Sequence, residues 1–119
     1  RTLGYSGGED GAMLLEARFP QVKCPMFAGK VGADVVEKEA SKAEGLRRLC
    51  AFWGVEMRNT AAFGDSMNDV EIIREAGIGI AMGNSVPELK EEADYIAPHI
   101  REDGVYRACV HFQWFENFV

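Results

Sequence analysis

Hydrophobic and polar residues follow different patterns in the opening third of the chain and in the remainder. Residues 1–11 contain four glycines and little periodicity, which predicts a loop. Ala12–Phe19 has apolar side chains at helical spacing, and Pro20 would end that helix. Val22–Ala28 and Ala33–Glu37 are predicted to form two strands joined by a glycine-containing turn. The opening third is therefore expected to be an α+β unit with antiparallel strands.

From Lys42 onward, helical and extended patterns alternate. Apolar residues recur at helical spacing over residues 46–53, and Gly54 suits the end of that helix. Ser85 is expected to cap a later short helix. Short apolar runs typical of buried parallel strands lie at residues 60–63, 78–82 and 95–97. This order predicts an α/β fold with a parallel sheet and right-handed crossover connections.

Composition narrows the class of protein. The 119 residues are 47% hydrophobic and 27% charged, as in a globular domain, and 13 basic against 19 acidic side chains give a net charge of −6. This balance argues against a nucleic-acid partner, and no apolar run is long enough to cross a membrane. Cys24, Cys50 and Cys109 form no C-x-x-C pair, and no signal peptide opens the chain. We therefore expect free thiols and a cytoplasmic location.

A polar loop, Gly64–Asp69, directly follows the strand predicted at residues 60–63. Ligands of open parallel sheets bind beyond the carboxyl ends of the strands, where this loop would lie. Asp65 and Asp69 would repel each other there, and a hard divalent cation such as Mg²⁺ would offset that repulsion. The same residues also suit a turn at Asp65 followed by a helix cap at Asn68 or Asp69. The residues alone leave both interpretations open.

Lys42 lies in the first turn of a predicted helix. A cation at that position opposes the helix dipole, which is unfavourable unless the cation has a partner. Together with the backbone N–H groups of the helix start, its ammonium group would hold a phosphate. An ordinary surface lysine is the competing interpretation, since lysines are common in first turns.

Five short segments occur in a fixed order within residues 30–110: Ser41-Lys42, Phe63 to Asp69, Gly79 to Asn84, Glu91 to Ile96, and Glu102 to Val105. Together they resemble the C-terminal half of the haloacid dehalogenase superfamily, in its branch of Cof-type sugar-phosphate phosphatases. The resemblance implies that residues 38–119 are the C-terminal part of a Rossmann-like core. It also implies that residues 1–37 are the C-terminal remnant of an α+β cap domain.

The resemblance implies a role for four residues. Lys42 would hold the phosphate of a small phosphorylated substrate, and Asn68 would contact the phosphoryl group. Asp65 would bind Mg²⁺, and Asp69 would support the metal or its waters. Family members form an aspartyl-phosphate on an aspartate nucleophile, while Mg²⁺ and the lysine neutralise the phosphoryl charge.

One departure from the family is large. Nothing here matches the first motif, D-x-D-x-[TV], which supplies the nucleophile and the acid/base aspartate. We therefore expect the chain to be inactive alone. The alternative is a truncated module that acts by binding, or by self-association through an exposed sheet edge. A P-type ATPase domain shares the G-D-x-x-N-D loop, but Val70–Ile73 differs from the Ala-Pro-Ala-Leu usual there.

Overall fold

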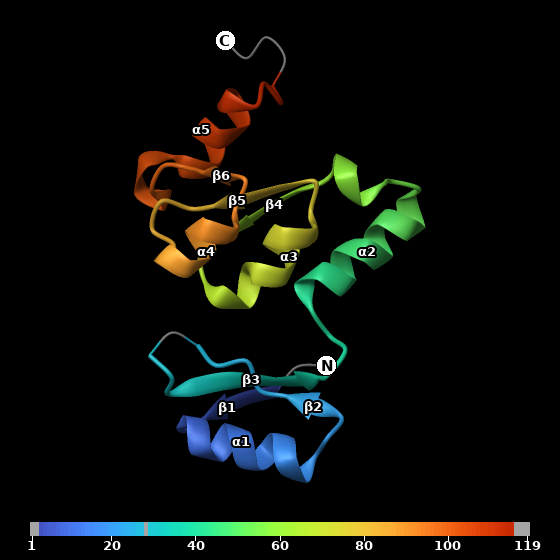
Figure 1. Ribbon diagram of the computed structural model, residues 1–119, viewed down its shortest axis with the longest axis vertical. Coiled ribbons are helices and arrows are strands. Elements are labelled where there is room, and N and C mark those ends of the chain that lie inside the picture. The colour runs from blue at the N-terminus through green and yellow to red at the C-terminus, as the bar shows by residue number, and fades with distance from the viewer. Residues whose placement is uncertain (1–2, 28, 116–119) are drawn as a thin grey trace. The chain divides into compact units, whose positions relative to one another are not determined.

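The computed structural model describes residues 3–27 and 29–115. The chain divides into two compact units, Arg1–Ser41 and Lys42–Val119 (Figure 1). The assignment of residues 1–37 to a cap domain and of residues 38–119 to a hydrolase core stays a prediction. No helix among the described residues is both long and apolar enough to span a bilayer.

The first unit is a three-stranded antiparallel sheet covered by one helix (Figure 1). Its strand order is β1-β3-β2, with Leu3 opposite Val35 and Val22 opposite Glu37. Ala12 of the helix packs with other small side chains in a core that includes Cys24 and Ala33. The elements are β1 (Leu3–Ser6), α1 (Glu9–Arg18), β2 (Val22–Lys23) and β3 (Gly32–Glu37).

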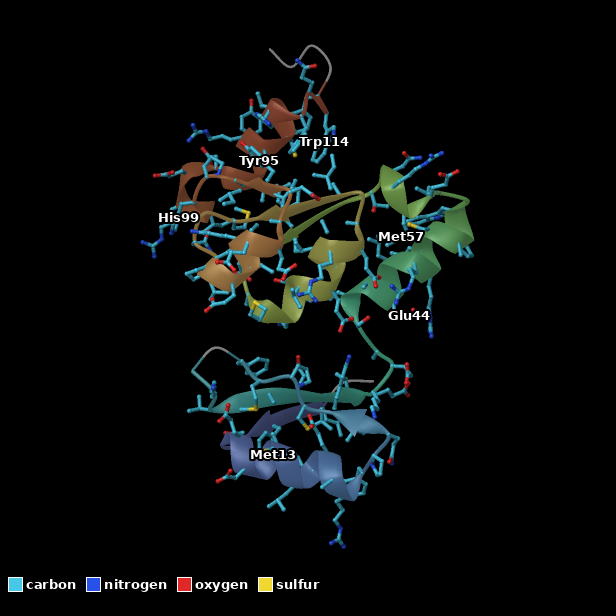
Figure 2. All side chains as sticks on the ribbon, viewed as in Figure 1. Met13, Glu44, Met57, Tyr95, His99 and Trp114 are labelled. Atoms are coloured by element: carbon cyan, nitrogen blue, oxygen red, sulfur yellow. The ribbon has the colours of Figure 1, made fainter. Side chains whose placement is uncertain are left out.

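The antiparallel pairing is confirmed, but two local predictions for this unit were wrong. Residues 3–11 are not a loop, because β1 pairs with β3 and α1 already begins at Glu9; residues 1 and 2 lie outside the described residues. The predicted helix is present as α1, and its Met13 side chain is exposed (Figure 2). The strand expected over residues 22–28 is regular only at Val22–Lys23 and continues as an isolated bridge at Met26. Ala28 lies outside the described residues.

The second unit confirms the predicted α/β order. Its three strands are parallel and ordered β4-β5-β6, so β4 and β6 form the two edges of the sheet among the described residues. The elements are α2 (Lys42–Trp53), β4 (Ala61–Gly64), α3 (Val70–Glu75), β5 (Ile78–Ala81), α4 (Pro87–Glu92), β6 (Tyr95–Ile96) and α5 (Gly104–His111), with 3₁₀ turns at Met57–Asn59, Met67–Asp69 and Ile100–Glu102.

Neighbouring residues of a strand point to opposite sides of the sheet, so both of its faces carry apolar side chains. Helices cover each face. Ala62 and Ala81 pack on one side with buried residues of α3 and α4, including Ile73 and Leu89. The opposite side buries Ile80 against α5, with the following core members: Met82, Ala97, Ala108 and the partly buried Phe63 and Phe112. Because the three strands are parallel, the loops that follow them lie at the same edge of the sheet.

Candidate functional site

The site is organised around Asp69, which ends the loop after β4 and is only 5% exposed. Its Oδ2 accepts hydrogen bonds from the backbone N–H groups of Asp65, at 3.0 Å, and of Ser66, at 3.4 Å. A short 3₁₀ turn, Met67–Asp69, carries this carboxylate back toward the beginning of its own loop. The side chain thereby closes the loop on itself.

Lys42 reaches this loop from the first residue of α2. Its ammonium group forms an ion pair with Oδ1 of Asp69, across 27 residues of sequence. The Lys42 side chain is 55% exposed, whereas that of Asp69 is 7% exposed. Burial alone would raise the pKa of Asp69, but Lys42 and the two backbone N–H groups together lower that pKa below its ordinary value. Asp69 is thus an anion at neutral pH, partnered by a cation that still contacts solvent.

Asp65 and Asn68 are the exposed polar residues of the loop. Within the described part of the chain, the Asp65 carboxylate accepts no hydrogen bond and forms no ion pair. The Asn68 side-chain oxygen accepts a hydrogen bond from the Ser66 hydroxyl group. The structure therefore brings Lys42, Asp65, Asn68 and Asp69 together at the carboxyl end of β4.

A fifth residue of the site, Ser85, was assigned the wrong role from the sequence. Val86, not Ser85, is the N-cap residue of α4. The buried Ser85 hydroxyl group instead donates a 3.1 Å hydrogen bond to the Gly64 carbonyl oxygen. In addition, the Val86 N–H group donates to the Asp65 carbonyl oxygen at 3.4 Å. A small polar residue in the loop after β5 was the only available signal for this contact.

Gly64 allows the loop to close so tightly. A Cβ atom at this position would lie 2.6 Å from the Cβ atom of Asp69, which is closer than two non-bonded carbon atoms approach. The carboxylate is therefore seated directly against the last residue of β4. The backbone of the loop is held by buried groups, while its exposed side chains are left for ligands.

The two carboxylates differ in how well they suit a metal ion. Asp65 fits, because its exposed oxygens are unoccupied among the described residues and carboxylate oxygens are the ligands Mg²⁺ prefers. Asp69 does not fit as a direct ligand, because both its oxygens already accept from nitrogen donors. Among residues 3–27 and 29–115, no group of three or more His, Cys, Asp and Glu side chains gathers as a complete metal site. These residues alone supply one carboxylate, and Mg²⁺ commonly takes its remaining ligands from water and substrate phosphate.

Comparisons with known proteins agree on one family. A family model described as haloacid dehalogenase-like hydrolase matches residues 15–109. A 5-amino-6-(5-phospho-D-ribitylamino)uracil phosphatase of Bacillus subtilis, YcsE, is 46% identical over 72 residues, which are 60% of this chain and 29% of that protein. A phosphoglycolate phosphatase of Methanobrevibacter smithii is 34% identical over 90 residues, which are 76% of this chain and 38% of that protein.

A solved structure shows the same fold. The subclass IIB sugar phosphatase BT4131 superposes with a TM-score of 0.84 at 29% identity, over 96% of this chain and 44% of its own. The chain thus spans less than half the length of each of these three proteins. The family model matches well over half of the chain, and the structural likeness extends over nearly all of it. On these grounds the chain belongs to the haloacid dehalogenase-like hydrolases, as its five ordered motifs predicted.

Proposed function

We propose that the protein containing this chain is a Mg²⁺-dependent phosphatase of small phosphorylated metabolites such as sugar phosphates, working through an aspartyl-phosphate intermediate. One observation carries the proposal: the ammonium group of Lys42 and the free carboxylate of Asp65 belong to one loop cluster at the carboxyl end of β4. That combination of one fixed cation and one unoccupied anion suits a phosphate bound beside a metal ion.

Each residue has a distinct task in this proposal. Lys42, whose side chain is 55% exposed, binds a phosphoryl oxygen through its ammonium group. Asn68 contacts the phosphoryl group, and Asp65 is the residue that would hold Mg²⁺. The metal, when bound, supplies further neutralisation of the charge on the phosphoryl oxygens. The nucleophile and the acid/base aspartate come from a part of the protein that lies outside these 119 residues, so the chain alone is inactive.

The substrate class is supported by what the relatives are called. YcsE is named for a phosphorylated ribityl compound, and BT4131 is described as a sugar phosphatase. Residues 1–37 are proposed to belong to the cap domain that covers such a substrate. The three free cysteines, of which Cys24 and Cys50 are buried, support a reducing compartment, and we place the protein in the cytoplasm.

A chimera tests the proposal. The part of YcsE that this chain matches is replaced by the corresponding residues of this chain, and Mg²⁺-dependent hydrolysis of p-nitrophenyl phosphate and of sugar phosphates is measured. We expect turnover by the chimera and none by the 119-residue chain alone. Lys42→Ala and Asp65→Asn should each lower turnover about 100-fold or more, because each leaves phosphoryl charge unbalanced.

Glu56→Gln is the matched control, because it removes an exposed carboxylate outside the site and should leave turnover unchanged. A folded chimera without phosphatase activity would contradict the proposal, as would a Lys42→Ala chimera with ordinary turnover. Comparable turnover by the chain alone would contradict the absence of the nucleophile.

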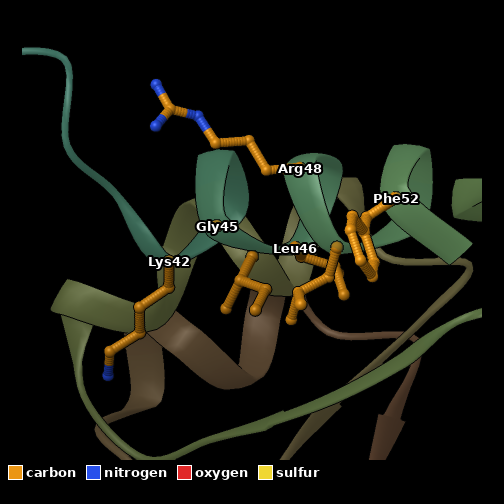
Figure 3. A pocket seen from close by; sticks show the side chains of 7 residues that line it. Lys42, Gly45, Leu46, Arg48 and Phe52 are labelled. Carbon is orange, nitrogen blue, oxygen red and sulfur yellow. The ribbon is translucent and has the colours of Figure 1, made fainter.

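A second candidate function, binding through self-association, is favoured by the surface of the second unit. β4 is an edge strand of the described sheet, which leaves its outer backbone groups available for pairing. On α2, Leu49, Phe52 and Trp53 are 48%, 83% and 67% exposed. Leu49 and Phe52 also line an open, apolar groove of about 670 Å³ (Figure 3). Sedimentation velocity over a range of concentrations tests this candidate: a growing sedimentation coefficient supports it, and a constant monomer value excludes it.

A further inference from the structure

We propose that Asn84 is a positioning residue that anchors the turn after β5, residues 83–86, and that this turn fixes the backbone carrying Asp65. The meaning for catalysis rests on the proposed phosphatase function, because that function assigns the metal to Asp65. The structural coupling can be measured without any activity. It gives a role to two sequence segments that the proposed function leaves unexplained, Gly79 to Asn84 and Glu102 to Val105.

The contact between the turn 83–86 and the loop after β4 is the first step. The Ser85 hydroxyl group donates to the Gly64 carbonyl oxygen at 3.1 Å, and the Val86 N–H group donates to the Asp65 carbonyl oxygen at 3.4 Å. The Asp65 carboxylate is exposed and has no partner among the described residues, so its place is set by its own backbone. The turn therefore supports the residue that would hold Mg²⁺.

The anchor of this turn on its other side is the second step, where the turn meets the segment after β6. The Asn84 side-chain oxygen accepts a hydrogen bond from the Ile100 N–H group at 3.0 Å. Ile100 begins a 3₁₀ turn, Ile100–Glu102, so its N–H group has no acceptor within that turn. The Gly83 N–H group also donates to the Pro98 carbonyl oxygen, at 3.4 Å. The turn 83–86 is thus bonded to two residues of this segment.

The segment after β6 is itself closely packed. A Cβ atom at Gly83 would lie 2.7 Å from the backbone nitrogen of His99, a residue labelled in Figure 2. A Cβ atom at Gly104 would lie 2.1 Å from the Pro98 carbonyl oxygen. Asp103, directly before α5, has a left-handed φ of 57°. The segment is therefore enclosed by the turn 83–86 and the beginning of α5, and it is a firm support for the Asn84 carboxamide.

Removal of the Asn84 carboxamide should loosen the turn without removing a metal ligand. The turn would keep the longer bond from Gly83, and the Ile100 N–H group would lose its acceptor. Loss of groups that orient a metal ligand commonly lowers metal affinity by about 10–100-fold. We expect about three- to tenfold here, because Asn84 acts on Asp65 through the intervening turn.

Amide hydrogen exchange in the 119-residue chain tests the structural coupling. Asn84→Ala should accelerate exchange at the Val86 amide by about fivefold or more, because Val86 donates to Asp65 from within the loosened turn. Asn84→Asp keeps an acceptor oxygen and should restore slow exchange. Asn59→Ala is the matched control: it removes an exposed carboxamide from the 3₁₀ turn before β4 and should leave the Val86 rate unchanged.

The Mg²⁺ dependence of the YcsE chimera separates positioning from general stabilisation. In the chimera with Asn84→Ala, the Mg²⁺ concentration giving half-maximal rate should rise about three- to tenfold. The kcat at saturating Mg²⁺ should change less than about twofold, because no group that contacts the substrate is removed. A variant that is merely less stable would lose active protein, and therefore kcat, without a change in its Mg²⁺ requirement.

The outcomes distinguish this inference from the proposed function. Faster exchange at Ile100 with an unchanged rate at Val86 would overturn the inference, because the anchor would then not reach the loop of Asp65. An active chimera whose Mg²⁺ requirement is unmoved by Asn84→Ala would also overturn it. A folded, inactive wild-type chimera contradicts the proposed function, and the Val86 rates then decide the inference. Asn84 is exposed, so its variants should fold, and urea unfolding followed by fluorescence of Trp53 and Trp114, both in the second unit, verifies this.

Discussion

The hydroxyl group of Ser85 donates a hydrogen bond to the carbonyl oxygen of Gly64, 21 residues earlier in the chain. This contact joins the loop after β5 to the end of β4, where the candidate site begins. The Met82 N–H group donates to the same oxygen at 2.9 Å. The two neighbouring loops at this edge of the sheet are therefore a single hydrogen-bonded structure.

Removing the Ser85 hydroxyl group should weaken that structure without breaking it. Ser85→Ala is expected to lower the free energy of unfolding of the second unit by about 1 kcal/mol, because the Gly64 carbonyl oxygen keeps its bond from Met82. Urea unfolding followed by tryptophan fluorescence measures the change. Ser6→Ala, at an exposed site in the first unit, is the control and should have no effect. An unchanged midpoint in Ser85→Ala would show that the hydroxyl bond contributes nothing.

Two glycine substitutions should act in opposite directions. Gly64→Ala is expected to destabilise the second unit by about 1–3 kcal/mol, because its Cβ atom would collide with that of Asp69. Gly45→Ala in α2 is the matched comparison, since no atom lies within 4 Å of its added Cβ. There we expect a gain of about 0.5–1 kcal/mol, the usual advantage of alanine over glycine inside a helix. Equal effects at the two positions would refute the close seating of Asp69.

Acid should weaken the second unit through Asp69. The pKa of Asp69 in the folded chain lies below its ordinary value of 3.8, which is the value expected after unfolding. The ionised carboxylate therefore contributes its full stabilisation above about pH 4, and this contribution is lost as the pH falls through the lower, folded-state pKa. Urea unfolding at pH 7 and pH 3 measures the loss, and Asp69→Asn should reduce it. An identical loss in wild type and Asp69→Asn would assign it to other carboxylates.

Cys24 should resist alkylation. Burial, and next the nearby Glu16 carboxylate, raise the pKa of the Cys24 thiol, and the thiolate is the reactive form. We expect iodoacetamide at pH 8 to modify the half-buried Cys109 at least several-fold faster than Cys24, as followed by peptide mass mapping. Denaturation in urea is the control and should bring the two rates together. Faster reaction at Cys24 in the folded chain would contradict its burial.

Much of the second unit could be predicted from the sequence because its local signals agree with its tertiary structure. The segments that became α2, β4 and β5 each carry the periodicity or the apolar run that their burial requires. β1 carries neither: Leu3–Ser6 contains a glycine, and Leu3 is 68% exposed. It becomes a strand only by pairing with β3, and a pairing with a distant segment cannot be predicted from the residues of β1 alone.

The candidate site could likewise be predicted from the sequence only in part. The sequence placed Asp65, Asn68 and Asp69 on one loop, and the family resemblance added Lys42 to it. Which carboxylate accepts from Lys42 and which stays free depends on the 3₁₀ turn that folds Asp69 back under its own loop. Ser85 was misassigned because its sequence context suits a helix cap equally well, and its partner Gly64 is recognisable only once β4 and β5 are adjacent.

The buried framework of the loop has a consequence for how such a protein can change over generations. Its shape is maintained by Gly64, Asp69 and Ser85, which are hidden from solvent, whereas Asp65 and Asn68 are exposed. Substitutions at the exposed positions can alter ligand chemistry at little cost in folding, because those side chains do not support the backbone. Ligand preference and folding stability therefore depend on separate residues, so the exposed residues of the loop can change during evolution without unfolding it.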